Sequence, residues 1–182
     1  MSIKLNKACY VIRVIKTYVS EKSLISVYFS YFHSLLKYGI IFWGNSPVSK
    51  DIFKIQKRAI RIITGKGRCD SCKQLFKKLN ILTLSSQYIV SLIDFVIKNR
   101  ELYGTNRDVH GLTARNSFDL HLPSVNMTVV QRGVLYSGCK VFNKLPTHTK
   151  NLLDNPRHLK KRLKSYLLDL TLYRLEEFYQ LP

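Results

Sequence analysis

The chain has 182 residues, of which 46% are hydrophobic and only 8 are Gly and 5 are Pro. This composition allows a buried core and excludes an intrinsically disordered or collagen-like protein. Lys and Arg number 30 against 11 Asp and Glu, so the formal net charge is +19 and the pI is near 10.0. Such a surplus repels itself unless counterions or a polyanion neutralise it, and the commonest polyanionic partner is nucleic acid, followed by an anionic membrane surface.

Two helices are predicted at the start of the chain. Apolar residues recur with helical spacing over about residues 3–18, and Ser20 has the chemistry of an N-cap for a second helix that reaches about residue 42. Polar side chains such as His33 and Lys37 interrupt the apolar run of the second helix. We therefore interpret it as a central core helix and expect no membrane partner. His33 is expected to be a hydrogen-bonded core histidine.

The third predicted helix has the most informative pattern. Ser46 as N-cap and Pro47 at the first helical position predict its start, and Gly65 suits a left-handed C-cap. At about 100° per residue, its cations fall on one side and its apolar residues on the other. The apolar residues are Ile52, Ile55, Ala59, Ile62 and Ile63.

A charged helix face has two interpretations, plain solvation and contact with phosphate. A solvated face usually mixes both signs of charge, whereas only Asp51 is acidic here, so we favour phosphate contact. The predicted nucleic-acid-binding residues of this helix and of the loop after it are Lys50, Lys54, Lys57, Arg58, Arg61, Lys66 and Arg68.

The middle of the chain changes character. A short helix is expected from Asp70 or Ser71 to about residue 79, and a longer one from Ser85 or Ser86 to about residue 99. Residues 104–133 then form an insert rich in Asn, Asp, Gly and Thr. In this insert, the period-two alternation over 118–122 and the β-branched run 128–130 predict short strands or a small β-hairpin.

Helices return in the last third of the chain. One is predicted over about residues 134–145, and Asn155 followed by Pro156 predicts the start of a long final helix. Its apolar and basic residues again separate by helical spacing. The basic side, also predicted to bind nucleic acid, consists of Arg157, Lys160, Lys161 and Lys164. The predicted fold is mainly α, a multi-helix bundle with a loop-rich insert.

No catalytic centre is indicated. Metal-dependent nucleotidyl transfer needs paired carboxylates, and the adjacent Glu176 and Glu177 would point about 100° apart on a helix. Cys69 and Cys72 have zinc-knuckle spacing but lack a second ligand pair, so we interpret them as reduced thiols. Residues 65–67 lack the full phosphate-loop motif, and we interpret them as a simple C-cap turn; the alternative is a turn whose backbone amides contact a phosphate. We therefore predict no catalytic residue and no metal ligand.

Several segments resemble the reverse transcriptases of jockey-type LINE (non-LTR) retrotransposons, in the region after the polymerase fingers and palm. They are 31–44 (YFHSLLKYGIIFWG), 55–65 (IQKRAIRIITG), 70–84 (DSCKQLFKKLNILTL) and 136–146 (YSGCKVFNKLP), while 5–13 (LNKACYVIR) resembles the thumb. The segments occur in the order found in the family, and they are distributed between residues 5 and 146.

The resemblance implies the carboxyl-terminal part of an RNA-directed DNA polymerase. A thumb-like helical segment (1–45) would grip the template–primer duplex. A basic helical segment (46–103), the insert (104–133) and a C-terminal helical segment (134–182) would hold element RNA or target DNA. The implied partners are RNA or DNA and the missing palm and fingers.

The resemblance also limits what this chain can do alone. Magnesium would belong to the missing polymerase domain, so we expect neither a cofactor in this chain nor polymerase activity from it. The implied location is intracellular, in the nucleus or in a cytoplasmic ribonucleoprotein. The alternative is a non-functional remnant, or a self-associating structural fragment, of a decayed element.

Overall fold

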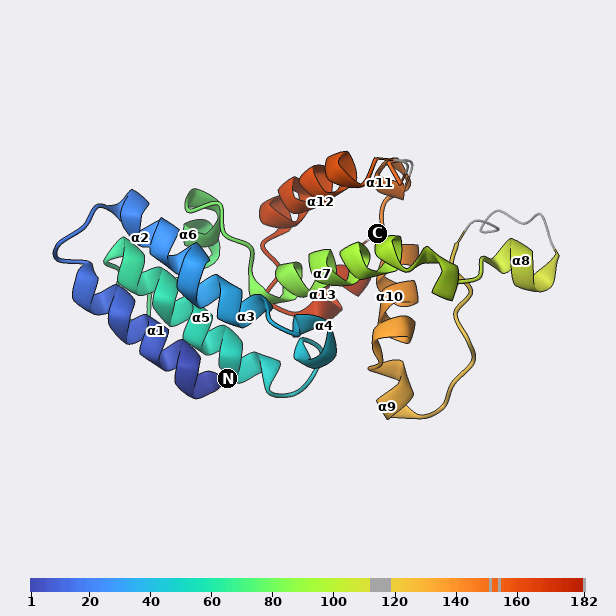
Figure 1. The fold of residues 1–182 in the computed structure, drawn as a ribbon, viewed down its shortest axis with the longest axis horizontal. Helices are drawn as coiled ribbons and strands as arrows, with labels where there is room; N and C mark the ends of the chain where they lie inside the picture. The colour runs from blue at the N-terminus through green and yellow to red at the C-terminus, as the bar shows by residue number, and fades with distance from the viewer. Residues whose placement is uncertain (112–118, 151, 154, 182) are drawn as a thin grey trace.

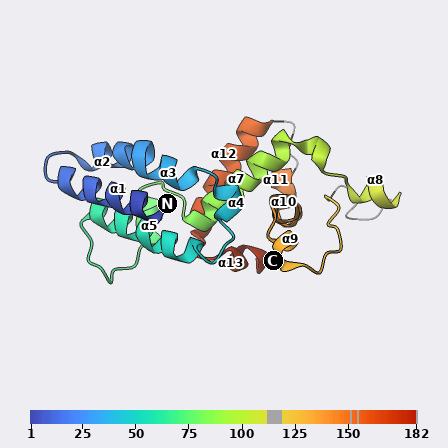
Figure 2. The ribbon, with the colours of Figure 1, turned by 60° about the horizontal axis from the view of Figure 1, so that its bottom comes forward.

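The computed structural model is mainly helical, which confirms the predicted fold class (Figure 1). It describes residues 1–111, 119–150, 152–153 and 155–181. The molecule is elongated, with a bundle of N-terminal helices at one end and the insert at the other. A long central helix, α7 (Leu84–Lys98), runs between them (Figure 2).

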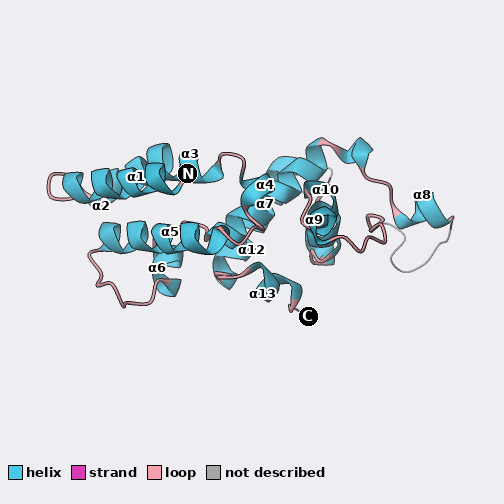
Figure 3. Ribbon diagram, turned by 90° about the horizontal axis from the view of Figure 1, so that it is seen from below, coloured by secondary structure: helices cyan, strands magenta, loops and turns pink. Residues whose placement is uncertain are grey.

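The N-terminal bundle consists of three rods. They are α1 (Ser2–Ile15), α5 (Ser49–Thr64) and a continuous rod built from α2 (Glu21–Val27), the π-helical η1 (Tyr28–His33) and α3 (Ser34–Lys37). Figure 3 shows α1 and the α2–α3 rod on one side of the bundle and α5 on the other. The rods meet over fully buried side chains, among them Leu5, Ile12, Tyr28, Phe32 and Ile60.

The second predicted helix is correct at its start and wrong at its end. The Ser20 hydroxyl accepts a hydrogen bond from the Ser23 amide at 3.3 Å, which is the predicted N-cap. The helix stops before residue 42 because Gly39 adopts a left-handed conformation (φ 61°), and α4 (Ile40–Trp43) is a separate turn. Within the described residues, no helix combines the length and the apolarity that crossing a bilayer requires.

The start of α5 also differs from the prediction. The Ser46 hydroxyl donates to the Trp43 carbonyl at 2.6 Å instead of capping a helix, and α5 begins at Ser49. Its end is as predicted, since Gly65 has φ 70° and its amide donates back to Ile62.

Of two other predicted caps, one is wrong and one is partly right. The formal N-cap residue of α6 (Lys73–Lys78), Cys72, makes no side-chain cap bond, but the Ser71 hydroxyl accepts a long hydrogen bond, 3.5 Å, from the Lys73 amide. Helix α7 is capped by Thr83, whose hydroxyl accepts from the Ser86 amide at 3.3 Å and donates to the Leu172 carbonyl at 2.5 Å. One threonine therefore caps the central helix and ties it to the C-terminal segment, which leaves Ser85 and Ser86 inside the helix.

The central helix is surrounded by the rest of the chain. It packs against α10 (Val134–Asn143) and α12 (Pro156–Leu170). The last helix, α13 (Leu175–Tyr179), contacts α10, where Lys140 Nζ lies 4.5 Å from the centre of the Tyr179 ring. Asn155 caps α12 and Pro156 is its first residue, as predicted. Two short helices complete this part of the fold, η2 (Arg100–Leu102) and α11 (Thr147–Lys150).

The insert contains no hairpin among its described residues. Its β pairing there is a single antiparallel bridge between Thr105 and Leu120. The Asn143 side chain bonds both the amide (2.8 Å) and the carbonyl (2.7 Å) of Leu120, groups that a second strand would otherwise need. Phe118, where the predicted strand began, lies outside the described residues. The predicted strand at 128–130 is instead part of a helix, α9 (Thr128–Gln131), and α8 (Asn106–His110) precedes it.

Candidate nucleic-acid interface

Helix α5 separates apolar and basic residues as predicted. Ile52, Ala59 and Ile63 are buried, and Ile55 and Ile62 are half-buried against the same core. The basic residues of the helix are exposed or half-exposed. The charged side is therefore available to solvent along about 16 Å of helix, from Lys50 to Arg61.

The cations of α5 do not form one row, because they line two different hollows. Lys50, Lys54 and Lys57 line a hollow at the start of the helix, where Arg132 and Arg174 join them from distant parts of the chain. The other α5 cations line a second hollow at the end of the helix. The row predicted from helical spacing is thus divided by the segments that pack around α5.

Two cations of the first hollow already have partners. Lys54 Nζ lies 2.8 Å from the Asp51 carboxylate, and this hydrogen bond lowers the pKa of Asp51. Lys57 Nζ lies 5.0 Å from the centre of the Phe53 ring and 5.4 Å from that of Tyr173, which are cation–π distances. The predicted phosphate contact of Lys54 therefore competes with an acid, and that of Lys57 with two aromatic rings.

The second hollow gathers six cations from three segments of the chain. We call it the α1–α5 hollow. It has a volume of about 750 Å³. Its basic residues are Arg13 of α1 and Lys16 directly after it, Arg58 and Arg61 of α5, and Lys66 and Arg68 of the loop that follows α5. In the described part of the chain, none of the six forms an ion pair.

Neutral groups hold the two arginines of α5 in place. Arg61 donates through Nε and Nη2 to the carbonyl oxygen of Asp70, at 2.9 and 2.7 Å. Arg58 Nη2 donates to the side-chain oxygen of Asn6 in α1. Because a carbonyl and an amide carry no net charge, both guanidinium groups are oriented while their positive charge remains available.

The sequence prediction missed Arg13 and Lys16. Both lie near the C-terminal end of α1, where a cation is ordinarily explained by the helix dipole. Their role in the hollow depends on the packing of α1 against α5, two helices more than 30 residues apart, and helical spacing within one segment carries no such information.

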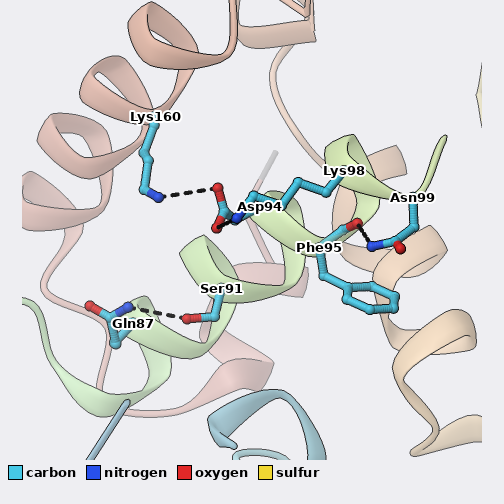
Figure 4. Close-up of polar contacts among 7 residues, drawn as sticks. All are labelled: Gln87, Ser91, Asp94, Phe95, Lys98, Asn99 and Lys160. Atoms are coloured by element: carbon cyan, nitrogen blue, oxygen red, sulfur yellow. Dashed lines mark hydrogen bonds and ion pairs between the residues drawn. The ribbon is translucent and has the colours of Figure 1, made fainter. Parts of the chain in front are cut away.

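The basic side of α12 is exposed as predicted, opposite the buried Leu159, Leu163 and Leu167. Its cations line neither hollow. Figure 4 shows Lys160 directed toward α7, where its Nζ lies 3.1 Å from Asp94. Asp94 also pairs with Lys98 at 3.2 Å; burial acts to raise its pKa, but the hydrogen bonds and charges of the two lysines lower it. Lys160 is therefore partly neutralised, whereas Arg157, Lys161 and Lys164 have no acid partner in the described residues.

His33 differs from its prediction. Its Nδ1 is buried and has no hydrogen-bond partner in the described residues. Burial, together with the nearby charges of Lys37 and Lys164, lowers the pKa of His33 to about 4. The ring is packed against Phe29 instead, with centroids 5.4 Å apart, so His33 is held by contacts and not by hydrogen bonds.

The other polar motifs show no arrangement for chemistry. Cys69 is exposed and Cys72 is buried, both are free thiols, and burial raises the pKa of Cys72. Gly67 donates its amide to the Asp70 carboxylate at 2.9 Å, so that amide of the 65–67 turn is not available to a phosphate. Among the residues described, no group of three or more His, Cys, Asp or Glu side chains is placed to hold a metal ion.

Comparison of the chain with protein-family models, with curated proteins and with solved structures gives no match.

Proposed function

We propose that this chain is a nucleic-acid-binding module, the carboxyl-terminal region of a jockey-type reverse transcriptase without the polymerase active site. The observation that carries the binding proposal is the α1–α5 hollow, where six cations converge without an ion pair in the described residues. The resemblance of the five sequence segments supports the family assignment.

The binding would depend on phosphates and show little base specificity. Guanidinium groups with unused N–H donors recognise phosphate oxygens in pairs, and lysines add point charges. Such contacts neutralise phosphates and release condensed counterions, so the affinity should fall as salt rises. The exposed α12 residues Arg157, Lys161 and Lys164 would provide a second basic surface, separate from the hollow.

The proposal is tested by measuring the affinity for duplex DNA, an RNA–DNA hybrid and single-stranded RNA between 50 and 300 mM salt. If about five cations engage phosphates, the slope of log K against log salt is about −4 to −5 for duplex DNA and about −3.5 for the single strand. A flat salt response would exclude phosphate-driven binding.

The obvious triple variant, with Lys54, Lys57 and Arg61 changed to Glu, is unsuitable because Lys57 and Arg61 also hold local structure. A cleaner variant changes Lys50, Lys54, Lys66 and Arg68 to Ala. Its matched control changes four exposed lysines that line neither basic hollow: Lys4, Lys22, Lys73 and Lys77. We expect the first variant to lose at least tenfold in affinity and the control less than threefold.

We further propose that the chain alone does not polymerise. Glu176 and Glu177 are adjacent in the sequence, but Glu177 accepts a hydrogen bond from the Tyr173 amide at 3.3 Å instead of facing a shared cation site. A primer-extension assay with magnesium should give no product. Extended product from the purified chain would contradict this assignment.

Self-association is a second candidate function, favoured by one observation. Tyr38 and Phe42 are 81% and 76% exposed, and they border a mainly apolar hollow that includes Ile40 and Ile41. Exposed apolar patches mark interaction surfaces, and this one would suit a polymerase palm or a second copy. Light scattering over a concentration series tests it: association that disappears in a Tyr38→Ser, Phe42→Ser variant supports this role, and a monodisperse monomer excludes it.

A further inference from the structure

We propose that the α1–α5 hollow binds a phosphate group bearing several negative charges at one point, a terminal di- or triphosphate, in preference to the phosphodiesters of a nucleic-acid backbone. Two sources share this chemistry: the 5′ end of an RNA, and a free polyphosphate such as a nucleotide. The first source rests on the proposed nucleic-acid function, and the second does not.

The first argument is the charge balance of the hollow. The C-terminal ends of α1 and α5 act together as about one negative charge, and Asp70 adds another. The six cations exceed this by about four charges. The helix ends therefore account for a minor part of the cluster, and the rest is balanced by mobile counterions unless a multiply charged anion replaces them.

The second argument compares the charge that each ligand brings. A hollow of about 750 Å³ has the volume of a sphere roughly 11 Å across, enough for two or three phosphates of one strand at one charge each. A terminal phosphate carries about −1.5 to −2 at pH 7. Each further phosphate in a polyphosphate adds another negative charge, and neighbouring phosphates in a polyphosphate lie closer together than neighbouring phosphates of a nucleic-acid strand. A triphosphate thus matches the surplus of the hollow more closely than a backbone segment does.

The third argument is that the hydrogen-bond donors of Arg61 are preorganised for an anion. Arg61 uses two of its five N–H donors on Asp70, so three remain for an anion. Its orientation is fixed before a ligand arrives, which reduces the entropy cost of binding.

Lys16 is placed by the turn at the end of α5. A β-carbon built on Gly65 would lie 3.1 Å from Lys16 Nζ, so the ammonium group lies directly over the glycine. Gly65 also has φ 70°, a conformation that favours glycine. The turn therefore lets Lys16 approach the α5 arginines, and it brings the cations of three segments to one place.

The test uses the full chain in 150 mM salt. The probes are inorganic tripolyphosphate and two single-stranded RNAs of the same sequence, one with a 5′-triphosphate and one with a 5′-hydroxyl. We expect the 5′-triphosphate RNA to bind about tenfold more tightly than the 5′-hydroxyl RNA. Tripolyphosphate should compete for the same site.

Two matched double variants locate the effect. Arg13→Ala, Lys16→Ala removes two cations that belong to the hollow alone, and it should abolish both the advantage of the triphosphate end and tripolyphosphate binding. Lys50→Ala, Lys54→Ala changes the other basic hollow and should leave the advantage intact. Far-UV circular dichroism checks that both variants stay folded, and Arg68→Ala, in the exposed loop, provides an independent third variant.

The outcomes separate this inference from the proposed function. Equal binding of the two RNAs together with no tripolyphosphate binding would overturn the inference, while salt-dependent RNA binding would leave the proposed function standing. A third outcome is a chain that binds neither RNA but binds tripolyphosphate, with Arg13→Ala, Lys16→Ala abolishing that binding. It would support a free polyphosphate as the ligand of the hollow and overturn the nucleic-acid role.

Discussion

Gln56 lies fully buried in α5, among helices that are far apart in the sequence. Its side-chain amide nitrogen donates to the Tyr28 hydroxyl at 3.0 Å and to the Leu82 carbonyl at 2.9 Å. A buried polar group is costly unless it is hydrogen-bonded. The Gln56 amide nitrogen provides a bond for the hydroxyl and the carbonyl, while Gln56 Oε1 has no partner among the described residues. Gln56 therefore joins the α2–α3 rod, α5 and the segment before α7.

Replacing this glutamine should be more costly than removing one of its partners. Gln56→Leu leaves the Leu82 carbonyl and the Tyr28 hydroxyl without their hydrogen-bond donor, so we expect the free energy of unfolding to fall by about 2–3 kcal/mol. Tyr28→Phe removes one bond and should cost about 1 kcal/mol. Urea unfolding of both variants and of the double variant measures the coupling. Equal losses from the two single substitutions would show that the Leu82 bond contributes nothing.

His33 should make stability depend on pH. The folded protein keeps the ring neutral down to about pH 4, whereas the unfolded chain protonates it near pH 6.5. Between these values the unfolded state binds more protons. The contribution is therefore complete above pH 6.5 and is lost as the pH falls to about 4.

The measurement compares urea unfolding of the wild type and His33→Phe at pH 7 and pH 4.5. The wild type should lose about 1–2 kcal/mol more than the variant over this interval, allowing for solvent screening of a half-buried ring. Asp94, whose pKa is lowered, loses its contribution only below about pH 4 and is common to both proteins. The same loss in both proteins would rule out His33 as the group responsible.

At the residue scale, sequence periodicity indicated which side chains are buried better than it indicated which residues they contact. Helical spacing places Gln56 beside Ile52 and Ala59 and so indicates an inward position, but its hydrogen bonds go to residues 26 and 28 positions away. The same limit applies to Lys57, whose aromatic neighbour Tyr173 belongs to the end of the chain. Such pairs are set by tertiary packing, which a local pattern does not encode.

Helices α7 and α10 approach closely at a glycine. A β-carbon on Gly138 would lie 2.9 Å from both the Tyr103 hydroxyl and the Val96 side chain. Val96 is fully buried in α7, so it has little room to move. Gly138 therefore sets the distance between the two helices.

Gly138→Ala should force these helices apart and lower the free energy of unfolding by about 1–3 kcal/mol. For a chain of this length, that corresponds to a fall in melting temperature of at least about 2–4 °C. Gly104→Ala is the control, because a β-carbon there would meet Val109 at an ordinary 3.5 Å. If the two substitutions lower the melting temperature equally, close helix packing is not the cause.

The loop between α5 and α6 is fastened by Arg61, which bonds the Asp70 carbonyl through two N–H groups. Arg61→Lys keeps the charge but loses this paired geometry. We expect trypsin to cut at Lys66 and Arg68 severalfold faster in the variant, because both residues are exposed and the loop opens more often. Mass spectrometry identifies the cut sites, and cleavage at Lys22 serves as the internal control. An unchanged rate at the loop would mean that Arg61 does not restrain it.

Element ends were predictable where one side chain or one glycine determines them. Ser20, Gly65 and Asn155 act as expected because their chemistry is local. Prediction failed where a distant contact intervened. Thr83 caps α7 while it bonds the Leu172 carbonyl, and Asn143 satisfies the Leu120 backbone that was expected to join a hairpin.

Across the whole molecule, one hydrophobic core contains residues from both halves of the chain, and the cations lie outside this core. Buried side chains of every long helix belong to one contiguous cluster. The basic hollows lie where helices from different parts of the chain meet, so the fold determines which cations are brought together. The net charge of +19 was visible in the sequence, but its concentration in the α1–α5 hollow was not.

That concentration should reduce stability when no anion is bound. Like charges in one hollow repel one another, and salt screens them: the Debye length is about 30 Å at 10 mM and about 10 Å at 100 mM. The melting temperature of the wild type should therefore rise with salt. In 10 mM salt, a variant with Arg13, Lys16, Lys66 and Arg68 changed to Ala should melt about 2–4 °C above the wild type.

The matched control, with Lys4, Lys22, Lys73 and Lys77 changed to Ala, removes the same charge from dispersed positions and should gain less. Both differences should shrink in 300 mM salt. Cations that served the fold would behave in the opposite way, because their removal would lower the melting temperature at every salt concentration. If the hollow variant melts below the wild type in 10 mM salt, these residues stabilise the fold, and the main support for an anion-binding site is lost. If it melts above the wild type, the residues cost stability, as expected of residues kept for a ligand.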